Sequence, residues 1–144
     1  MIKVVLDTNI FISSIFWKGN PRRIIDLAVT NKIKSVTSPD ILHEIETVLF
    51  EDFPEIPYEK IEEIIKDILS YSYLAAVDEI IVKDLRDIKD TKIISCAVSA
   101  KADYLVTGDK DLLILKEYKG IKILNSKAFL NLFEGWDSAT HPEK

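Results

Sequence analysis

Short apolar runs rich in β-branched residues alternate along this chain with segments of helical period, and this alternation most constrains the fold. The runs at 2–6, 35–37, 104–107 and 121–124 predict strands. Between them, apolar residues recur every three or four positions, as they do in amphipathic helices. Strands that are separated by helices are typical of a parallel sheet. We therefore expect an α/β fold, a three-layer αβα sandwich.

Helix signals fill the gaps between these strands. The second helix, at 21–29, has Asn20 as its predicted cap and Pro21 at its first position. Ser38 is the predicted cap of the next helix. The other expected elements are helices at 9–16, 38–49, 56–69, 90–102 and 126–133, a short helix or turn at 112–115, and a strand at 79–82. Residues 1–134 are expected to form one domain, followed by a flexible tail at 135–144.

Composition excludes several classes of protein. The single cysteine, Cys96, permits neither an internal disulfide nor a cysteine-rich zinc site, and its apolar neighbours predict a buried side chain. No run approaches the ~20 apolar residues of a membrane span, and the chain opens on a strand, so we expect a cytoplasmic protein. The net charge of -5 offers no global attraction for a nucleic acid, so any such contact depends on local basic residues.

Acidic residues stand where functional groups gather in such sheets, beyond the carboxyl ends of the strands. Asp7 ends the first strand, Glu44 lies on the helix after the second, and Asp90 and Asp109 flank the strand at 104–107. Singly, each is equally an ordinary cap, turn or surface residue. Together, carboxylates at one edge repel one another unless a cation neutralises them. Oxygen ligands favour Mg²⁺, Mn²⁺ or Ca²⁺, and such an ion promotes phosphodiester hydrolysis.

At these motifs the sequence resembles the PIN-domain family. The resemblance runs in order from about residue 2 to 133, and its most specific part is the segment 102–113, ADYLVTGDKDLL. The other matching segments are Asp7-Thr8-Asn9 after the first strand, the helix that carries Glu44, and the segment 87–90. It is closest to the prokaryotic PIN proteins that are described as toxins of toxin–antitoxin pairs.

The resemblance implies a metal-dependent endoribonuclease that uses Mg²⁺ or Mn²⁺ to cut RNA, with single-stranded RNA as the expected substrate. By position, its catalytic acids are Asp7, Glu44, Asp90 and Asp109. Asp7 and Asp90 are then direct metal ligands, and Asp109 binds directly or through water. Glu44 either reaches the metal through water or acts as a base.

The resemblance also implies residues that orient these carboxylates, namely Thr8, Asn9 and Thr107. Two further acids remain open at this stage. Asp111 lies two positions after Asp109 and is an additional candidate metal ligand. Asp87 lies three residues before Asp90 and competes with it; we prefer Asp90 because the predicted helix begins directly after it.

Four basic residues near the motifs are candidates for RNA contact: Arg22, Arg23, Lys92 and Lys110. For each of them, ordinary solvated surface charge is the alternative interpretation. The resemblance implies two further partners besides the RNA substrate, a second copy of the chain in a homodimer and an antitoxin protein. The helix at 56–69 offers an apolar face for such a partner, with core packing as the alternative.

Two other functions compete with a nuclease. An aspartyl phosphatase of the haloacid-dehalogenase type also has an Asp after its first strand, but it normally carries a second Asp where this chain has Asn9. The other rival is a catalytically weak PIN domain that acts as an RNA-binding or assembly module. The presence of all four acids argues against that rival.

Overall fold

The central sheet carries the functional edge of this protein. The computed structural model describes residues 1–78 and 88–140, and in them six strands form one sheet. Every neighbouring pair is parallel except β5 and β6, which are antiparallel. In sheet order the strands are β3 (Ser72–Leu74), β2 (Lys34–Thr37), β1 (Lys3–Leu6), β4 (Tyr104–Val106), β6 (Ile121–Leu124) and β5 (Glu117–Tyr118). The predicted α/β class is confirmed.

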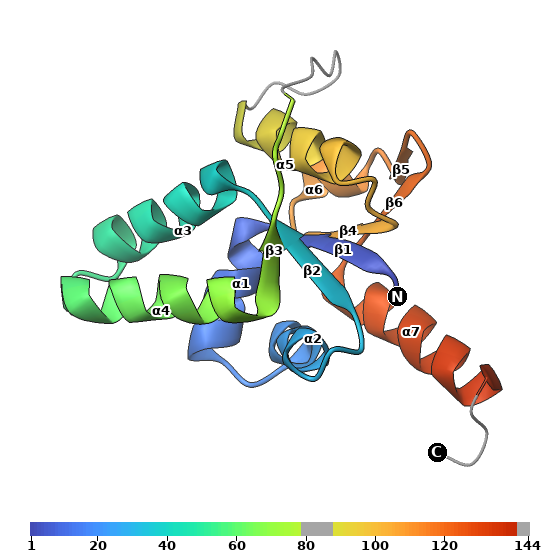
Figure 1. Cartoon of the computed structure of the whole chain (residues 1–144), viewed down its shortest axis with the longest axis horizontal. Helices are drawn as coiled ribbons and strands as arrows, with labels where there is room; N and C mark the ends of the chain where they lie inside the picture. Colours follow the sequence, from blue (N-terminus) through green and yellow to red (C-terminus); the bar gives the residue numbers. More distant parts are fainter. Residues whose placement is uncertain (79–87, 141–144) are drawn as a thin grey trace.

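Helices cover both faces of this sheet. In Figure 1, α5 lies on one side of the sheet, and α1, α2 and α7 lie on the other. The α3–α4 pair projects beside β3, and the two helices pack against each other. The helices are α1 (Thr8–Phe16), α2 (Asn20–Val29), α3 (Pro39–Asp52), α4 (Tyr58–Tyr71), α5 (Ile88–Ser99), α6 (Lys110–Leu113) and α7 (Ser126–Thr140). The arrangement is the expected three-layer sandwich.

The inner strands are apolar because both of their faces are covered. Val4, Val5 and Leu6 of β1 and Leu105 and Val106 of β4 are all fully buried. A strand between two helical layers has no solvated face, so its sequence is a continuous apolar run instead of an alternation. Burial of this run fixes β1 and β4 as neighbours at the centre of the sheet.

Two helices end in the same hydrogen-bonded motif. After α5, Lys101 takes a left-handed conformation with φ of 53°, and the Ala102 N–H donates to the Ala97 carbonyl over 2.9 Å. After α2, Asn31 takes φ of 60°, and the next N–H makes the equivalent bond to Leu27. These bonds satisfy carbonyls that a helix end leaves open. The motif ends α5 at Ser99, three residues before the predicted end at 102.

The starts of several elements also differ from the predictions. Gly19 is the cap of α2, so Asn20 is its first helical residue and not its cap. The α5 helix begins at Ile88, and Asp90 therefore lies inside its first turn instead of before it. At α3, Ser38 is the cap as predicted, and its Oγ accepts from the Ile41 N–H over 3.2 Å.

Some segments were absent from the prediction or were misassigned. The short strands β3 and β5 had not been predicted, and the predicted strand at 79–82 lies outside the described residues. The last helix continues to Thr140, so residues 135–140 of the expected tail are helical. Residues 141–144 of that tail also lie outside the described part of the chain.

Burial settles two of the open alternatives. Ile61, Ile64 and Ile68 of α4 are buried, so the apolar stripe of that helix is core. Cys96 is fully buried on α5, and burial raises the pKa of its thiol to about 11. Of the helices that the structure describes, none is long and apolar enough to cross a membrane.

Candidate active site

The register of the two central strands brings Asp7 and Thr107 together. Leu6 of β1 pairs with Val106 of β4, so the residues that follow them leave the sheet side by side. The Asp7 N–H donates to the Val106 carbonyl over 3.0 Å. The Thr107 hydroxyl donates to Asp7 Oδ2 over 2.6 Å. Two residues that are a hundred positions apart are thus joined at the carboxyl edge of the sheet.

Asp7 is a buried carboxylate whose two oxygens both accept hydrogen bonds. Oδ1 accepts from the Thr8 N–H over 2.7 Å, which also makes Asp7 the cap of α1, while Oδ2 accepts from Thr107. Burial raises the pKa of Asp7, the two hydrogen bonds lower it, and the negative charge of Asp109 raises it further. The raised pKa results because burial outweighs both hydrogen bonds. Asp7 therefore caps α1 and lies close enough to Asp109 for their charges to interact, but it is not a member of the group of three carboxylates described next.

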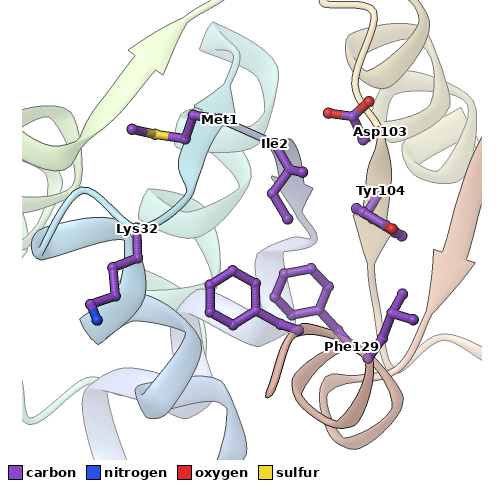
Figure 2. A pocket seen from close by; sticks show the side chains of 8 residues that line it. Met1, Ile2, Lys32, Asp103, Tyr104 and Phe129 are labelled. Carbon is purple, nitrogen blue, oxygen red and sulfur yellow. The ribbon is translucent and has the colours of Figure 1, made fainter. Parts of the chain in front are cut away.

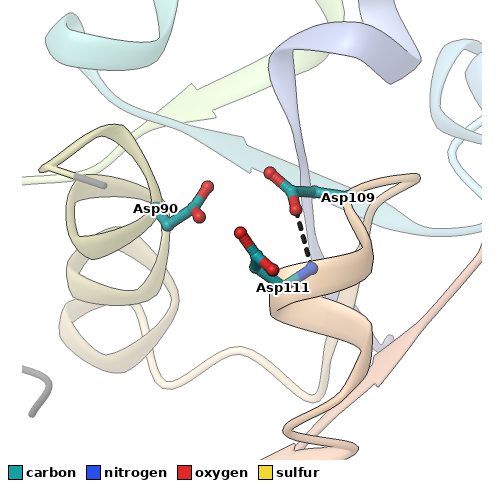
Figure 3. Close-up of side chains that lie close together, drawn as sticks. All are labelled: Asp90, Asp109 and Asp111. Atoms are coloured by element: carbon teal, nitrogen blue, oxygen red, sulfur yellow. Dashed lines mark hydrogen bonds between the residues drawn. The ribbon is translucent and has the colours of Figure 1, made fainter. Parts of the chain in front are cut away.

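Three other carboxylates converge beside Asp7. Oxygens of Asp90, Asp109 and Asp111 all lie within 4.8 Å of one another. Figure 3 shows the Asp90 side chain extending from α5 toward those of Asp109 and Asp111, which come from the start of α6. Asp90 is buried, whereas Asp111 is exposed. The structure therefore brings Asp111, which sequence analysis left open, into the same group as Asp90 and Asp109.

Backbone hydrogen bonds hold the turn between β4 and α6. The Asp109 N–H donates to Thr107 Oγ1 over 3.0 Å, and the Asp111 N–H donates to Asp109 Oδ1 over 2.8 Å. Asp109 is consequently the cap of α6. A continuous chain of contacts runs from Asp7 through Thr107 and Asp109 to Asp111. Thr107 is central to it because its hydroxyl donates to one acid and accepts from the backbone of another.

Glu44 is not a member of this group. It is on α3, about a quarter exposed, and its Oε1 is 4.0 Å from the Nζ of Lys89 on α5. A second ion pair joins the same two helices, between Lys92 Nζ and Asp40 Oδ1 at 3.5 Å. Sequence analysis missed Lys89 and Asp40. Lys89 lies three residues before Lys92, and Asp40 lies four before Glu44. These spacings place each pair on one face of a helix, and they are the sequence signal that could have indicated the ion pairs.

The donor set fits a divalent cation with a preference for oxygen. Three carboxylates that converge within 4.8 Å bring three negative charges together at the sheet edge. Ligand distances of about 2.0–2.6 Å to Mg²⁺ or Ca²⁺ allow one ion to bridge such oxygens. Nitrogen and sulfur ligands are absent from this described group, so its chemistry favours Mg²⁺ or Mn²⁺ over a thiolate-bound metal.

The other predicted orienting residues differ in what they contact. Thr8 is buried and acts on Asp7 through its backbone N–H; its own hydroxyl has no hydrogen-bond partner within residues 1–78 and 88–140. Asn9 is exposed in the first turn of α1. Asp87, the alternative to Asp90, lies outside the described residues. Asp90 itself reaches the cluster from inside the first turn of α5, where a negative charge interacts favourably with the helix dipole.

The candidate RNA contacts fall in two places. Lys110 is exposed beside Asp111 on α6, and Lys92 lies at the α3–α5 edge. Arg22 and Arg23 are both exposed on α2, where Arg23 forms an ion pair with Glu134 of α7. This second pair of residues thus belongs to the α2–α7 side of the molecule and not to the acidic edge.

An apolar cavity of about 370 Å³ lies at the opposite end of the strands. Figure 2 shows Ile2, which precedes β1, and Tyr104, the first residue of β4, facing Phe129 of α7 across it. Lys32 and Asp103 are the charged residues in its lining. Because the amino ends of β1 and β4 border this cavity, it is separate from the acidic edge and shares none of its residues.

Comparison with known proteins identifies a family and similar chains, among them the two that follow. The family described as PIN domain matches residues 3–111. An uncharacterised protein of Methanocaldococcus jannaschii is 35% identical over 144 residues, covering 92% of each chain. The fold also resembles a chain in the crystal structure of VapBC2 from Rickettsia felis bound to a DNA fragment from their promoter. That match has a TM-score of 0.62 and 17% identity, and it covers 86% of this chain and 98% of that one.

Proposed function

Since this chain belongs to the PIN-domain family, whose members are generally nucleases, we propose that it is a divalent-metal-dependent endoribonuclease. Its substrate is single-stranded RNA, its reaction is hydrolysis of phosphodiester bonds, and its cofactor is Mg²⁺ or Mn²⁺. The observation that carries the proposal is the convergence of Asp90, Asp109 and Asp111 within 4.8 Å, next to Asp7. Carboxylates this close together repel one another unless a cation neutralises them.

Each acid has a distinct task in this proposal. Asp90, Asp109 and Asp111 hold the ion, and Asp7 completes the set from the end of β1. A divalent ion, when bound, offsets charge that builds on the phosphodiester oxygens and lowers the pKa of water. Glu44 accepts the proton of the attacking water at its carboxylate, because it is partly exposed and pairs with Lys89, the residue next to Asp90 in the chain.

The orienting groups determine the geometry of these acids. Thr107 and the Thr8 N–H hold the two oxygens of Asp7, so its carboxylate is fixed before a ligand arrives. Fixed ligands bind an ion at a smaller entropic cost than mobile ones do. Asn9 belongs to the same group in the proposal, because it stands two residues after Asp7 on the first turn of α1.

Cleavage of a labelled single-stranded RNA tests this function. We expect the wild-type chain to cut it in Mn²⁺ or Mg²⁺ and to stop in EDTA. Asp7→Asn and Asp90→Asn should each abolish cleavage while circular dichroism and the unfolding transition show a folded protein. Asp26→Asn is the matched control, because Asp26 is an exposed acid on α2. Cleavage that persists in EDTA would refute the metal mechanism.

A toxin role is a second candidate, favoured by the likeness of fold to a chain of VapBC2. In this candidate the chain is a homodimeric cytoplasmic toxin that an antitoxin protein restrains. Induced expression in a bacterial host should then arrest growth, and the Asp90→Asn chain should not. Growth arrest by both chains would exclude toxicity through RNA cleavage. RNA binding without cleavage would instead indicate a non-catalytic binding module.

A further inference from the structure

Two lysines of α5 lie within two residues of Asp90 and pair with acids of α3. Lys89 and Lys92 are three residues apart, so they lie on one face of the helix, while Asp90 extends from the same turn toward α6. Their partners Glu44 and Asp40 are four residues apart on α3. The result is two parallel ion pairs that join α5 to α3 at the rim of the site.

These ion pairs are loose and accessible. The Nζ–oxygen separations are 4.0 Å for Lys89 and 3.5 Å for Lys92, longer than the ~2.7–2.9 Å of a strong charge-assisted hydrogen bond. The Lys89 side chain is 65% exposed and that of Lys92 is 41% exposed. Exposed pairs of this kind contribute little to stability, so either lysine can exchange its carboxylate for another anion at little cost.

An RNA strand at this site requires such cations. The chain carries a net charge of -5, and Asp90, Asp109 and Asp111 concentrate negative charge where a phosphate would approach. Phosphate affinity must therefore come from basic side chains immediately beside the acids. Arg22 and Arg23 lie on the α2–α7 side, whereas Lys89 and Lys92 lie on α5 within two residues of Asp90.

We propose that Lys89 and Lys92 form the phosphate-binding rim for the substrate strand, and that they leave Glu44 and Asp40 when RNA binds. The inference rests on the proposed nuclease function and deepens it.

Salt-dependent binding of a fluorescent single-stranded RNA, in EDTA to prevent cleavage, tests the rim. Each phosphate contact on single-stranded nucleic acid contributes about 0.7 to the slope of log affinity against log salt. Lys89→Gln/Lys92→Gln should therefore reduce that slope by about 1.4 and weaken binding by roughly 10- to 30-fold at 0.1 M salt. Lys60→Gln/Lys66→Gln is the charge-matched control, because these exposed lysines lie on α4, away from α5.

Asp40→Asn separates a phosphate rim from a structural ion pair. It removes the intramolecular partner of Lys92, so RNA binding should tighten by roughly 2- to 5-fold, opposite in sign to Lys92→Gln. Equal binding by the wild type and the double lysine variant would overturn the proposal that Lys89 and Lys92 bind phosphate. Weaker RNA binding by Asp40→Asn, or no RNA binding by the wild type, would overturn it as well.

A parallel cleavage assay in Mn²⁺ keeps the two proposals distinguishable. If the wild type cleaves RNA and the double lysine variant keeps its RNA affinity, the proposed role of the lysines is wrong and the proposed nuclease function is supported. If that variant loses RNA affinity but the wild type does not cleave RNA, the proposed role of the lysines is supported and the proposed nuclease function is wrong.

Discussion

Thr107 Oγ1 donates a 2.6 Å hydrogen bond to Asp7 Oδ2 and accepts one from the Asp109 N–H at 3.0 Å. A single hydroxyl therefore ties an acid at the end of β1 to the turn that carries two more. This bond also favours the charged form of Asp7 against the effect of burial. The position of Asp7 relative to the cluster depends on this side chain.

Replacement of Thr107 by valine should weaken the site without unfolding the protein. Thr107→Val keeps the shape and removes the hydroxyl, so we expect Mn²⁺ affinity and RNA cleavage to fall by about 10- to 100-fold. The pKa of Asp7 should rise further, because a hydrogen bond that lowers it is gone. Calorimetry measures the affinity, and NMR titration of the Asp7 carboxyl measures its pKa in EDTA.

Thr107→Ser is the matched control for this prediction. It retains the hydroxyl and should remain within a few-fold of the wild type in both measurements. A Thr107→Val protein that binds Mn²⁺ as the wild type does, with an unchanged Asp7 pKa, would show that the hydroxyl does not position the acid.

Sequence analysis found the members of this cluster because each stands at a strand end or in a recognisable motif. Asp7 and Asp109 follow buried strands, and parallel strands align their carboxyl ends at one edge. Asp111 stayed open because two residues of a turn project in directions that only the backbone determines. The capping bond from the Asp111 N–H to Asp109 Oδ1 closes that turn and leaves both carboxylates directed toward Asp90.

The parts of the fold that escaped prediction depend on tertiary contacts. The β3 strand has only three residues and gains its hydrogen bonds from β2, so its local sequence carries little signal. The end of α5 at Ser99 depends on the hydrogen bonds that follow the helix, which periodicity does not report. Likewise, the ion pairs of Lys89 and Lys92 join helices that lie far apart in the sequence.

The raised pKa of Asp7 predicts how the metal-free protein responds to pH. Burial raises this pKa above its ordinary value of 3.8, so folding favours the protonated form. The stability that Asp7 contributes is therefore present in full below about pH 4 and is lost as pH rises through the folded-state pKa. Near neutral pH and without metal, the charge on Asp7 opposes folding.

Asp7→Asn should accordingly raise the free energy of unfolding in EDTA at pH 7, while asparagine still caps α1. The gain should disappear at pH 3, where the wild-type side chain is protonated. Urea unfolding of both proteins at several pH values measures the difference. Added Mn²⁺ at about 100 times its Kd should stabilise the wild type by about 2.7 kcal/mol and the variant by much less. An Asp7→Asn protein that is less stable than the wild type at pH 7 in EDTA contradicts this account.

Asp111 should contribute to Mn²⁺ affinity about as much as Asp90 does. Its oxygens lie in the same group, yet its side chain is exposed, so Asp111→Asn leaves the core untouched. We expect Mn²⁺ affinity to fall at least about tenfold, a loss of about 1.4 kcal/mol, with the unfolding midpoint in EDTA unchanged. Asp26→Asn changes an exposed acid of α2 and should leave both the Mn²⁺ affinity and the unfolding midpoint as they are in the wild type. Unchanged Mn²⁺ affinity in Asp111→Asn would remove this residue from the ligand set.

Substitution of Glu44 distinguishes a general base from a metal ligand, because the two roles affect different measurements. It lies on α3, outside the group of oxygens within 4.8 Å, and its described ionic partner is Lys89 of α5. Removal of a general base typically reduces rate by about 10²- to 10⁴-fold. Glu44→Gln should therefore lose at least a hundredfold in cleavage rate at saturating Mn²⁺ and change Mn²⁺ affinity far less than Asp90→Asn does. If Glu44→Gln instead loses as much Mn²⁺ affinity as Asp90→Asn, then Glu44 is a metal ligand, and another group must accept the proton.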